Sequence, residues 1–118
     1  MKRVLIVDDE PDLLEAWSFA LEHVGYTVER AHNGKIALEA LADQVPDLII
    51  TDLMMPGMNG EELCRIVREN PAWAAIPIVL HTSAYVAAGS GALWNAVIRK
   101  PAKMEAFLST ISRLITRE

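Results

Sequence analysis

Val4-Leu5-Ile6-Val7-Asp8-Asp9 is a short apolar run that ends in two carboxylates. Two further runs follow the same plan, because Leu48-Ile49-Ile50-Thr51 leads into Asp52 and Ala96-Val97-Ile98-Arg99 leads into Lys100-Pro101. Short apolar runs bounded by turn residues are typical of strands buried on both faces, as in parallel sheets covered by helices. Ligands of such sheets bind beyond the carboxyl ends of the strands. The three acids and Lys100 are therefore predicted to gather at one edge.

Extended and helical patterns alternate along the rest of the chain. Strands are expected at 3–7, 27–31, 48–51, 78–81 and 96–99, and apolar residues recur at helical spacing over 11–24, 36–41, 63–67 and 103–116. Gly89 and Gly91 interrupt segment 84–94, so only a short or irregular helix is expected there. This alternation predicts an α/β fold with a parallel sheet, and right-handed crossovers favour a doubly wound sandwich.

Length, net charge and cysteine content limit the classes of protein to which the chain could belong. A chain of 118 residues has room for a single domain, 1–118, and its 52% hydrophobic content suits a sheet covered on both faces. A net charge of −5 without a Lys/Arg cluster disfavours a nucleic-acid surface. The single cysteine, Cys64, excludes an intramolecular disulfide and fits a reducing compartment. Because the sequence also shows neither a signal peptide nor an apolar stretch of membrane-spanning length, we expect a cytoplasmic domain.

Each polar residue at the predicted edge has a simpler explanation when it is taken alone. Asp8 and Asp9 could begin a helix, where acids favour the helix dipole, and Asp52 could be an ordinary turn residue. Lys100 could simply face solvent. Together they indicate more, because three neighbouring carboxylates repel one another unless a hard cation lies among them. Mg²⁺, which prefers oxygen ligands, is the expected cation.

Four motifs in register give the chain a family resemblance. Asp8-Asp9, the segment Asp52-Leu53-Met54-Met55-Pro56-Gly57-Met58-Asn59-Gly60, Thr82 and Lys100-Pro101 resemble the receiver domain of two-component response regulators over essentially the whole chain. The resemblance implies a CheY-like, flavodoxin-like fold: a three-layer (βα)5 sandwich with strand order 2-1-3-4-5, here with a shortened fourth helix. It also implies a phospho-acceptor signalling domain rather than an enzyme. The phosphoryl donor would be a sensor histidine kinase, a phosphotransfer protein or a small phosphodonor.

The resemblance also implies the metal ligands. Asp9 looks like the residue that binds Mg²⁺ directly, and Asp8 looks like the acid that holds a metal-bound water. Asp52 and the backbone carbonyl of Met54 would complete the protein ligands. So few suffice because Mg²⁺ keeps several of its waters. Mn²⁺ could take the same place.

The phosphoryl-binding residues are implied in the same way. Asp52 looks like the phospho-acceptor, a carboxylate that attacks phosphorus in line. Lys100 is expected to reach the phosphoryl oxygens, and Thr82 to hydrogen-bond one of them, with Ser83 as the alternative hydroxyl. The family further implies a cis peptide bond before Pro101.

Three departures from the family pattern concern the output of the domain. Val97 stands where the family usually has an aromatic residue that couples phosphorylation to the output surface. The segment between Thr82 and Lys100 is about one helical turn shorter than is typical, and Ala102 replaces a residue that is commonly large. Because these changes leave the acid site complete, we expect a chemically competent receiver with an unusual output.

The expected lifetime of the phosphorylated form follows from two further positions. Met54 and Ala84 lie where receiver domains of this family control autodephosphorylation. Neither side chain offers a polar group that would position an attacking water. The resemblance therefore predicts a relatively long-lived phosphoryl-aspartate.

Other classes of protein provide alternatives. A non-phosphorylated pseudo-receiver would serve as an interaction scaffold, and the altered output positions keep this interpretation open. A phosphatase with an aspartate nucleophile would need a second acid two residues after Asp52, where Met54 cannot transfer a proton. For a receiver, an unidentified downstream protein is the expected target, and homodimers are compatible with the sequence. The same sequence fits either a stand-alone regulator or the receiver portion of a longer protein.

Overall fold

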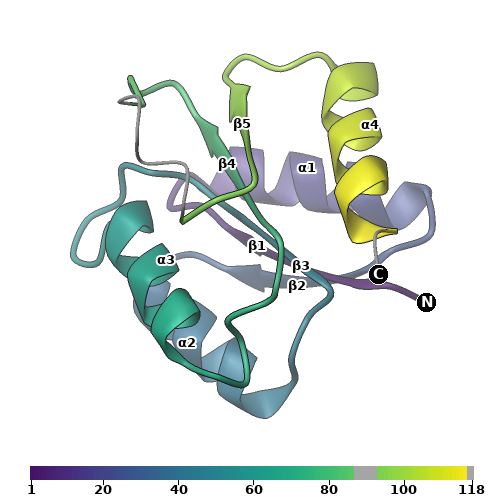
Figure 1. The fold of residues 1–118 in the computed structure, drawn as a ribbon. Coiled ribbons are helices and arrows are strands. Elements are labelled where there is room, and N and C mark those ends of the chain that lie inside the picture. The colour runs from purple at the N-terminus through teal and green to yellow at the C-terminus, as the bar shows by residue number, and fades with distance from the viewer. Residues whose placement is uncertain (87–92, 117–118) are drawn as a thin grey trace.

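Five parallel strands form one sheet at the centre of the molecule (Figure 1). The structure is a computed structural model that describes residues 1–86 and 93–116. The strand order is β2-β1-β3-β4-β5, which confirms the predicted order. The strands are β1 (Arg3–Val7), β2 (Thr27–Ala31), β3 (Leu48–Thr51), β4 (Ile78–Thr82) and β5 (Ala96–Arg99).

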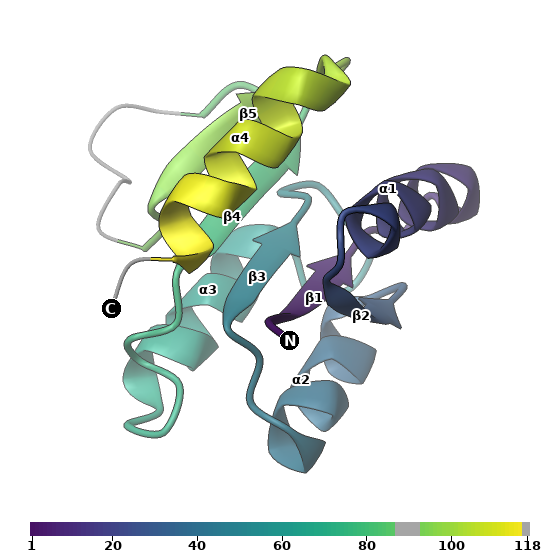
Figure 2. The ribbon, with the colours of Figure 1, turned by 90° about the vertical axis from the view of Figure 1, so that its right-hand side faces the viewer.

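Helices cover both faces of this sheet, as predicted for a three-layer sandwich. Helices α2 (Gly34–Asp43) and α3 (Gly60–Glu69) lie on one face, while α1 (Pro11–His23) and α4 (Met104–Ile115) lie on the other (Figure 2). None of the helices in the described part of the chain is long and apolar enough to cross a membrane.

The buried strands supply side chains to two separate cores. In β1, Leu5 and Val7 pack in the core beneath α2 and α3, whereas Val4 and Ile6 pack in the core beneath α1 and α4. This division follows from the two-residue period of a strand, which points successive side chains to opposite faces. It also explains why the four buried residues Val4 to Val7 are all apolar, because both faces of the strand are covered.

The register of the sheet brings the ends of the strands together. Val7 of β1 pairs with Thr51 of β3, and Thr82 of β4 pairs with Arg99 of β5. The next residues continue these ladders, since the Asp52 N–H donates to the Val7 carbonyl at 3.1 Å. Polar residues that follow β1, β3 and β5 therefore share one edge.

Local sequence signals determine where helices begin. Pro11 occupies the first turn of α1, as predicted. Asn59 caps α3, because its Oδ1 accepts the Glu62 N–H at 2.9 Å and the Glu62 side chain accepts the Asn59 N–H at 3.0 Å. This reciprocal capping box confirms the predicted cap and fixes the start of the helix that follows Asp52.

The segment before β5 differs from the rest of the sandwich. The predicted short helix in 84–94 falls largely on 87–92, which lie outside the described residues, and residues 83–86 and 93–95 are neither helix nor strand. Arg68 of α3 donates to the Leu93 carbonyl at 3.0 Å and to Asn95 Oδ1 at 3.1 Å. Trp94 is buried in the core beneath α2 and α3. Arg68 and Trp94 thus fasten the start of β5 to α3.

Gly60 provides a test of how closely α3 approaches the strand end. A Cβ at Gly60 would collide with the backbone carbonyl oxygen of Asp52 and would lie 2.8 Å from Leu53 Cα. Backbone cannot move aside as a side chain can, so Gly60→Ala should lower the free energy of unfolding by about 2–3 kcal/mol.

Gly34→Ala is the matched control at the first residue of α2. A Cβ at Gly34 would meet side-chain atoms of Met58, with Sδ at 2.6 Å and Cβ at 2.9 Å, rather than backbone. Better helix propensity offsets part of this contact, so the loss of stability should be smaller than for Gly60→Ala, about 1 kcal/mol. Urea denaturation of both variants measures the difference, and equal losses would contradict the proposed close backbone contact.

Candidate functional site

Lys100 lies at the centre of a charged cluster at the carboxyl edge of the sheet. Its Nζ is 2.9 Å from Asp8 Oδ2, 2.9 Å from Asp52 Oδ2 and 3.4 Å from Glu10 Oε1. The side chain of Lys100 is 11% exposed, and those of Asp8 and Asp52 are 5% and 8% exposed. Limited access of water strengthens these charge interactions.

Backbone groups fix the orientation of both buried carboxylates. Asp52 Oδ1 accepts the N–H groups of Leu53 at 2.7 Å and Met54 at 3.3 Å, so Oδ2 is left to face Lys100. Asp8 Oδ1 accepts the Glu10 N–H at 3.0 Å. Each aspartate therefore has one oxygen held by its own turn and one directed to the lysine.

Backbone hydrogen bonding also positions Lys100, which directly follows β5. The Lys100 N–H donates to the Thr82 carbonyl at 3.0 Å, which continues the β4–β5 ladder by one residue. The peptide bond between Lys100 and Pro101 is cis, as predicted. Lys100 lies two residues beyond the level of Asp52 in the register of the sheet, and its side chain reaches back to Asp8 and Asp52.

Burial and the lysine shift the ionisation of the cluster in different directions. Burial alone would raise the pKa of Asp52, but hydrogen bonds from Lys100 and Thr82 bring that pKa below its ordinary value. Burial raises the pKa of Asp8 above its ordinary value despite the Glu10 N–H and Lys100. The pKa of Lys100 is raised because its bonds to Asp52 and Asp8 outweigh its own burial. Asp52 and Lys100 therefore form a stable ion pair.

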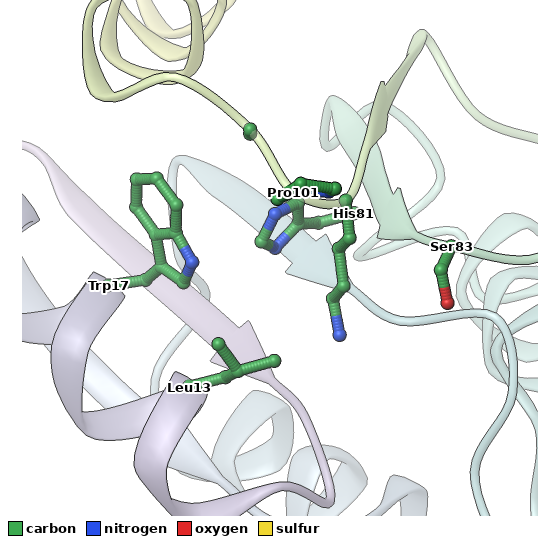
Figure 3. Close-up of a pocket in the computed structure, with 7 residues that line it drawn as sticks. Leu13, Trp17, His81, Ser83 and Pro101 are labelled. Carbon is green, nitrogen blue, oxygen red and sulfur yellow. The ribbon is translucent and has the colours of Figure 1, made fainter.

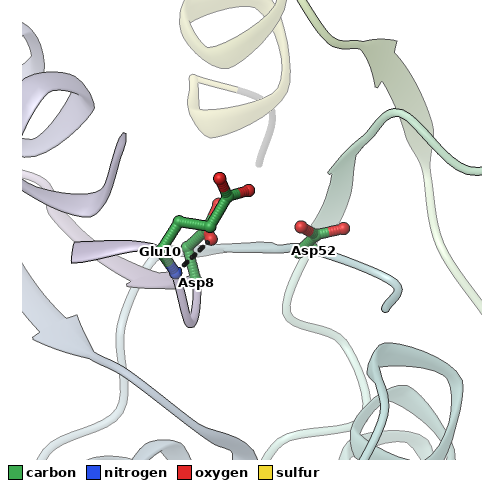
Figure 4. A group of neighbouring side chains, drawn as sticks. All are labelled: Asp8, Glu10 and Asp52. Atoms are coloured by element: carbon green, nitrogen blue, oxygen red, sulfur yellow. Dashed lines mark hydrogen bonds between the residues drawn. The ribbon is translucent and has the colours of Figure 1, made fainter. Parts of the chain in front are cut away.

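Three carboxylates at this edge could hold a metal ion. Oxygen atoms of Asp8, Glu10 and Asp52 all lie within 4.8 Å of one another (Figure 4). An all-oxygen set of this kind suits a hard divalent cation such as Mg²⁺. Glu10 was not among the predicted site residues. The only signal in the sequence was its place in the run Asp8-Asp9-Glu10, and its exposed carboxylate turns back toward Lys100.

The remaining predicted residues lie around this cluster. Asp9 is half-buried beside Asp8, but it is not part of the carboxylate group found among the described residues. The Met54 side chain is exposed, and the Met54 N–H donates to Asp52 Oδ1. Thr82 is buried at the end of β4, whereas Ser83 is exposed. A hydrogen bond from the Thr82 side chain helps to lower the pKa of Asp52.

Known sequences are similar to this chain over most of its length. A family described as the response regulator receiver domain matches residues 4–112. The chain is 35% identical over 119 residues to the response regulator ArlR of Staphylococcus saprophyticus, covering all of this chain and 54% of that protein. It is 39% identical over 82 residues to the DNA-binding response regulator MtrA of Mycolicibacterium smegmatis, covering 70% of this chain and 35% of that one. The chain thus spans about half or less of the length of these relatives.

Solved structures share the fold over almost the whole chain. A putative response regulator from Chloroflexus aurantiacus superposes with a TM-score of 0.91 at 31% identity, covering 98% of both chains. The response regulator TrrA of Thermotoga maritima, solved in complex with Mg²⁺-BeF, superposes with a TM-score of 0.88 at 30% identity. That match covers 97% of this chain and 99% of TrrA.

Replacing Lys100 should reverse the pKa shift of Asp52. In Lys100→Met the burial of Asp52 is no longer compensated, so the pKa of this carboxyl should rise above its ordinary value of about 3.9. In the original protein the pKa is lowered, so ionised Asp52 adds stability above pH ~4 that is lost as the pH falls through the folded pKa. In the variant the pKa of Asp52 is raised in the folded state, so protonation of this carboxyl at low pH should stabilise the fold rather than destabilise it.

Carboxyl ¹³C NMR titration of Asp52 measures this shift directly. Lys103→Met is the matched control, because Lys103 is exposed and makes no capping hydrogen bond. In Lys103→Met the pKa of Asp52 should remain below its ordinary value. An unchanged low pKa in Lys100→Met would show that the lysine does not determine the charge of this carboxylate.

Proposed function

The chain belongs to the response regulator receiver domain family, and we propose that it accepts a phosphoryl group on Asp52 in a Mg²⁺-dependent reaction. The observation that carries the proposal is the ion pair between Asp52 and Lys100 at the end of a buried strand, 2.9 Å between Oδ2 and Nζ. An ionised carboxylate beside a fixed ammonium supplies both a nucleophile and a counter-charge for phosphoryl oxygens.

The reaction is an in-line displacement at phosphorus. An Asp52 carboxylate oxygen forms the new bond to phosphorus, and the bond from phosphorus to the donor nitrogen or oxygen breaks with its electron pair remaining on the donor. Lys100 Nζ, which holds Asp8 and Asp52 in the resting protein, would then bind a phosphoryl oxygen. The Thr82 hydroxyl, at the end of β4, would hydrogen-bond another. The Leu53 and Met54 N–H groups keep the carboxylate oriented.

A divalent cation would be held by the acids at the same edge. When bound, Mg²⁺ supplies positive charge that neutralises the oxygens of the transferring group. We propose Asp9 as the direct carboxylate ligand, with Asp52 and the Met54 backbone carbonyl, and Asp8 through a metal-bound water. Glu10 lies in the same carboxylate group and would add charge at the rim of the site. Mn²⁺ would fit the same ligands.

The partners proposed for the domain follow from this reaction. A sensor histidine kinase, a phosphotransfer protein or a small phosphodonor would supply the phosphoryl group, and an altered protein contact would carry the signal. The net charge of −5 favours a protein rather than a nucleic acid as the direct contact of this domain. The buried thiol of Cys64, whose pKa burial raises to about 12, suits a reducing cytoplasm. Exposed Val97 on β5 replaces the usual aromatic residue on the output side, where homodimers could also form.

Intact mass after incubation with acetyl phosphate and Mg²⁺ tests the acceptor. The protein should gain the mass of one phosphoryl group only when Mg²⁺ is present, and Asp52→Asn should gain none because it lacks the nucleophile. Asp43→Asn is the matched control, since Asp43 is an exposed carboxylate at the end of α2. It should be labelled like the original protein.

An adduct that persists in Asp52→Asn would reject Asp52 as the acceptor. Absence of any adduct on folded protein, with acetyl phosphate and with histidine kinases alike, would favour the alternative function. The domain would then be a pseudo-receiver that acts as a scaffold, for which the exposed Val97 is the specific observation.

The phosphoryl-aspartate should be long-lived. Met54 is 66% exposed next to the acceptor turn, and Ala84 offers only its backbone N–H, which donates to Thr82 Oγ1 at 3.1 Å. Because neither side chain can orient water, Met54→Asn should shorten the half-life of the adduct several-fold, whereas Met54→Leu should not. The decay of the adduct mass in the absence of any phosphatase measures the half-life. Rapid loss from the unsubstituted protein would contradict this expectation.

A further inference from the structure

Glu10 is the carboxylate of the charged cluster that is neither the proposed acceptor nor a proposed ligand of Mg²⁺. It lies between β1 and α1, and its Oε1 is 3.4 Å from Lys100 Nζ. Lys100 thus has three carboxylate partners, since Asp8 and Asp52 each lie 2.9 Å from the same Nζ. One ammonium group cannot balance three carboxylates, so this edge of the sheet keeps an excess of negative charge.

An acid at the position of Glu10 would ordinarily be explained by the helix that follows it. Glu10 is the N-cap residue of α1, where a carboxylate can stabilise a helix by accepting its first N–H groups. In the part of the chain that the structure describes, its side chain makes no such capping hydrogen bond. The Glu10 N–H donates to Asp8 Oδ1 at 3.0 Å, and the side chain turns back to Lys100. The carboxylate is therefore directed toward the site rather than toward the helix.

Glu10 is much more exposed than the other two carboxylates of the cluster. Its side chain is 60% exposed, whereas those of Asp8 and Asp52 are 5% and 8% exposed. One carboxylate oxygen from each of the three lies within 4.8 Å of the others, and Figure 4 shows the three side chains around one space. Glu10 therefore lies on the solvent side of the space in front of Asp52, where an incoming group meets its charge.

A carboxylate at this place acts in opposite ways on the two ligands of the proposed reaction. A phosphodonor is an anion, so Glu10 repels it and also engages the ammonium group that would otherwise bind a phosphoryl oxygen. Mg²⁺ is attracted by the same charge. Because the Coulomb energy is proportional to the charge of the ligand, the repulsion is about twice as large for a dianion as for a monoanion.

We propose that Glu10 determines which phosphodonors the domain accepts, by disfavouring small dianions such as acetyl phosphate relative to donors that carry less negative charge. This role rests on the proposed phosphorylation of Asp52 and concerns the specificity of that reaction. Glu10 acts through Lys100 and through its own charge, without contact to the reacting atoms. Phosphoramidate, which carries a single net negative charge near neutral pH, is a donor that meets less repulsion.

Labelling by acetyl phosphate and by phosphoramidate tests the proposal. In both reactions an Asp52 oxygen forms the new bond to phosphorus. The P–O bond of acetyl phosphate breaks and acetate leaves with the electron pair, whereas the P–N bond of phosphoramidate breaks and ammonia leaves with it. At saturating Mg²⁺ and low ionic strength, Glu10→Gln should raise the initial rate about fivefold with acetyl phosphate and about twofold with phosphoramidate. Intact mass at successive times measures both rates.

Two further variants and the salt concentration separate the charge of Glu10 from its shape. Glu10→Asp keeps the carboxylate and should retain the donor preference of the original protein. Asp43→Asn removes one negative charge at the end of α2, just before β3 and thus at the opposite edge of the sheet, and should leave both rates unchanged. At about 1 M salt the Debye length falls to about 3 Å, so the advantage of Glu10→Gln should largely disappear.

The affinity for Mg²⁺ provides a second readout, in the absence of any donor. Glu10→Gln should weaken Mg²⁺ binding several-fold, because one attracting charge is lost. NMR shifts of the Leu53 and Met54 amides, which donate to Asp52, follow this titration. The variant should thus lose affinity for the cation while it gains rate with acetyl phosphate, whereas a general disturbance of the site would lower both.

The two donors also separate a failure of this role from a failure of the proposed function. Labelling by neither donor, in the original protein and in Glu10→Gln alike, would reject phosphorylation of Asp52 and the role of Glu10 with it. If the original protein is labelled but Glu10→Gln changes both rates by the same factor, or changes neither, the role of Glu10 alone is overturned. An undiminished affinity of Glu10→Gln for Mg²⁺ would equally show that this charge does not act at the site.

Discussion

The ion pairs of Lys100 are the interaction on which the carboxyl edge of the sheet depends. Asp8 and Asp52 are buried within reach of each other, and two carboxylates in such a place would repel. Lys100 Nζ lies 2.9 Å from both and supplies the missing positive charge. The same ammonium keeps Asp52 ionised, so the stability of this edge and the proposed role of this carboxylate as a nucleophile have a common origin. A bound divalent cation would share that role and release Lys100 toward a phosphoryl group.

The register of the sheet and the close packing of α3 against the end of β3 bring these charged residues together. Asp8, Asp52 and Lys100 follow three different strands, and they meet because the strands are parallel and their carboxyl ends share one edge. Lys100 starts two residues beyond the level of Asp52, and its long side chain spans the difference. The turn after Asp52 is closed by α3, whose first residue, Gly60, touches the Asp52 backbone. Capping by Asn59 fixes the start of that helix. Small displacements of α3 would therefore be transmitted directly to Asp52.

Much of this could be predicted from the sequence because strand patterns and turn residues are local signals. The apolar runs before Asp8, Asp52 and Lys100 indicated both the sheet and the shared edge. Two other features depend on the direction of side chains and on how residues from distant segments pack together. A local sequence pattern does not contain this information. The Glu10 side chain points toward Lys100 because of the backbone path of the turn after β1. The pocket lined by Trp17, His81 and Pro101 combines residues of α1, β4 and the loop after β5, which lie far apart in the sequence (Figure 3).

A crystal structure with Mg²⁺ and beryllofluoride, which mimics a phosphoryl group, tests the central claim most directly. The account predicts beryllium bonded to an Asp52 oxygen, Lys100 Nζ within hydrogen-bond distance of a fluoride, and the cation held by carboxylates of the run that begins at Asp8. Lys100 would then have exchanged a carboxylate partner for the bound group. A structure in which Lys100 stays paired with Asp8 and Asp52, with neither adduct nor cation at saturating concentrations, would contradict the account.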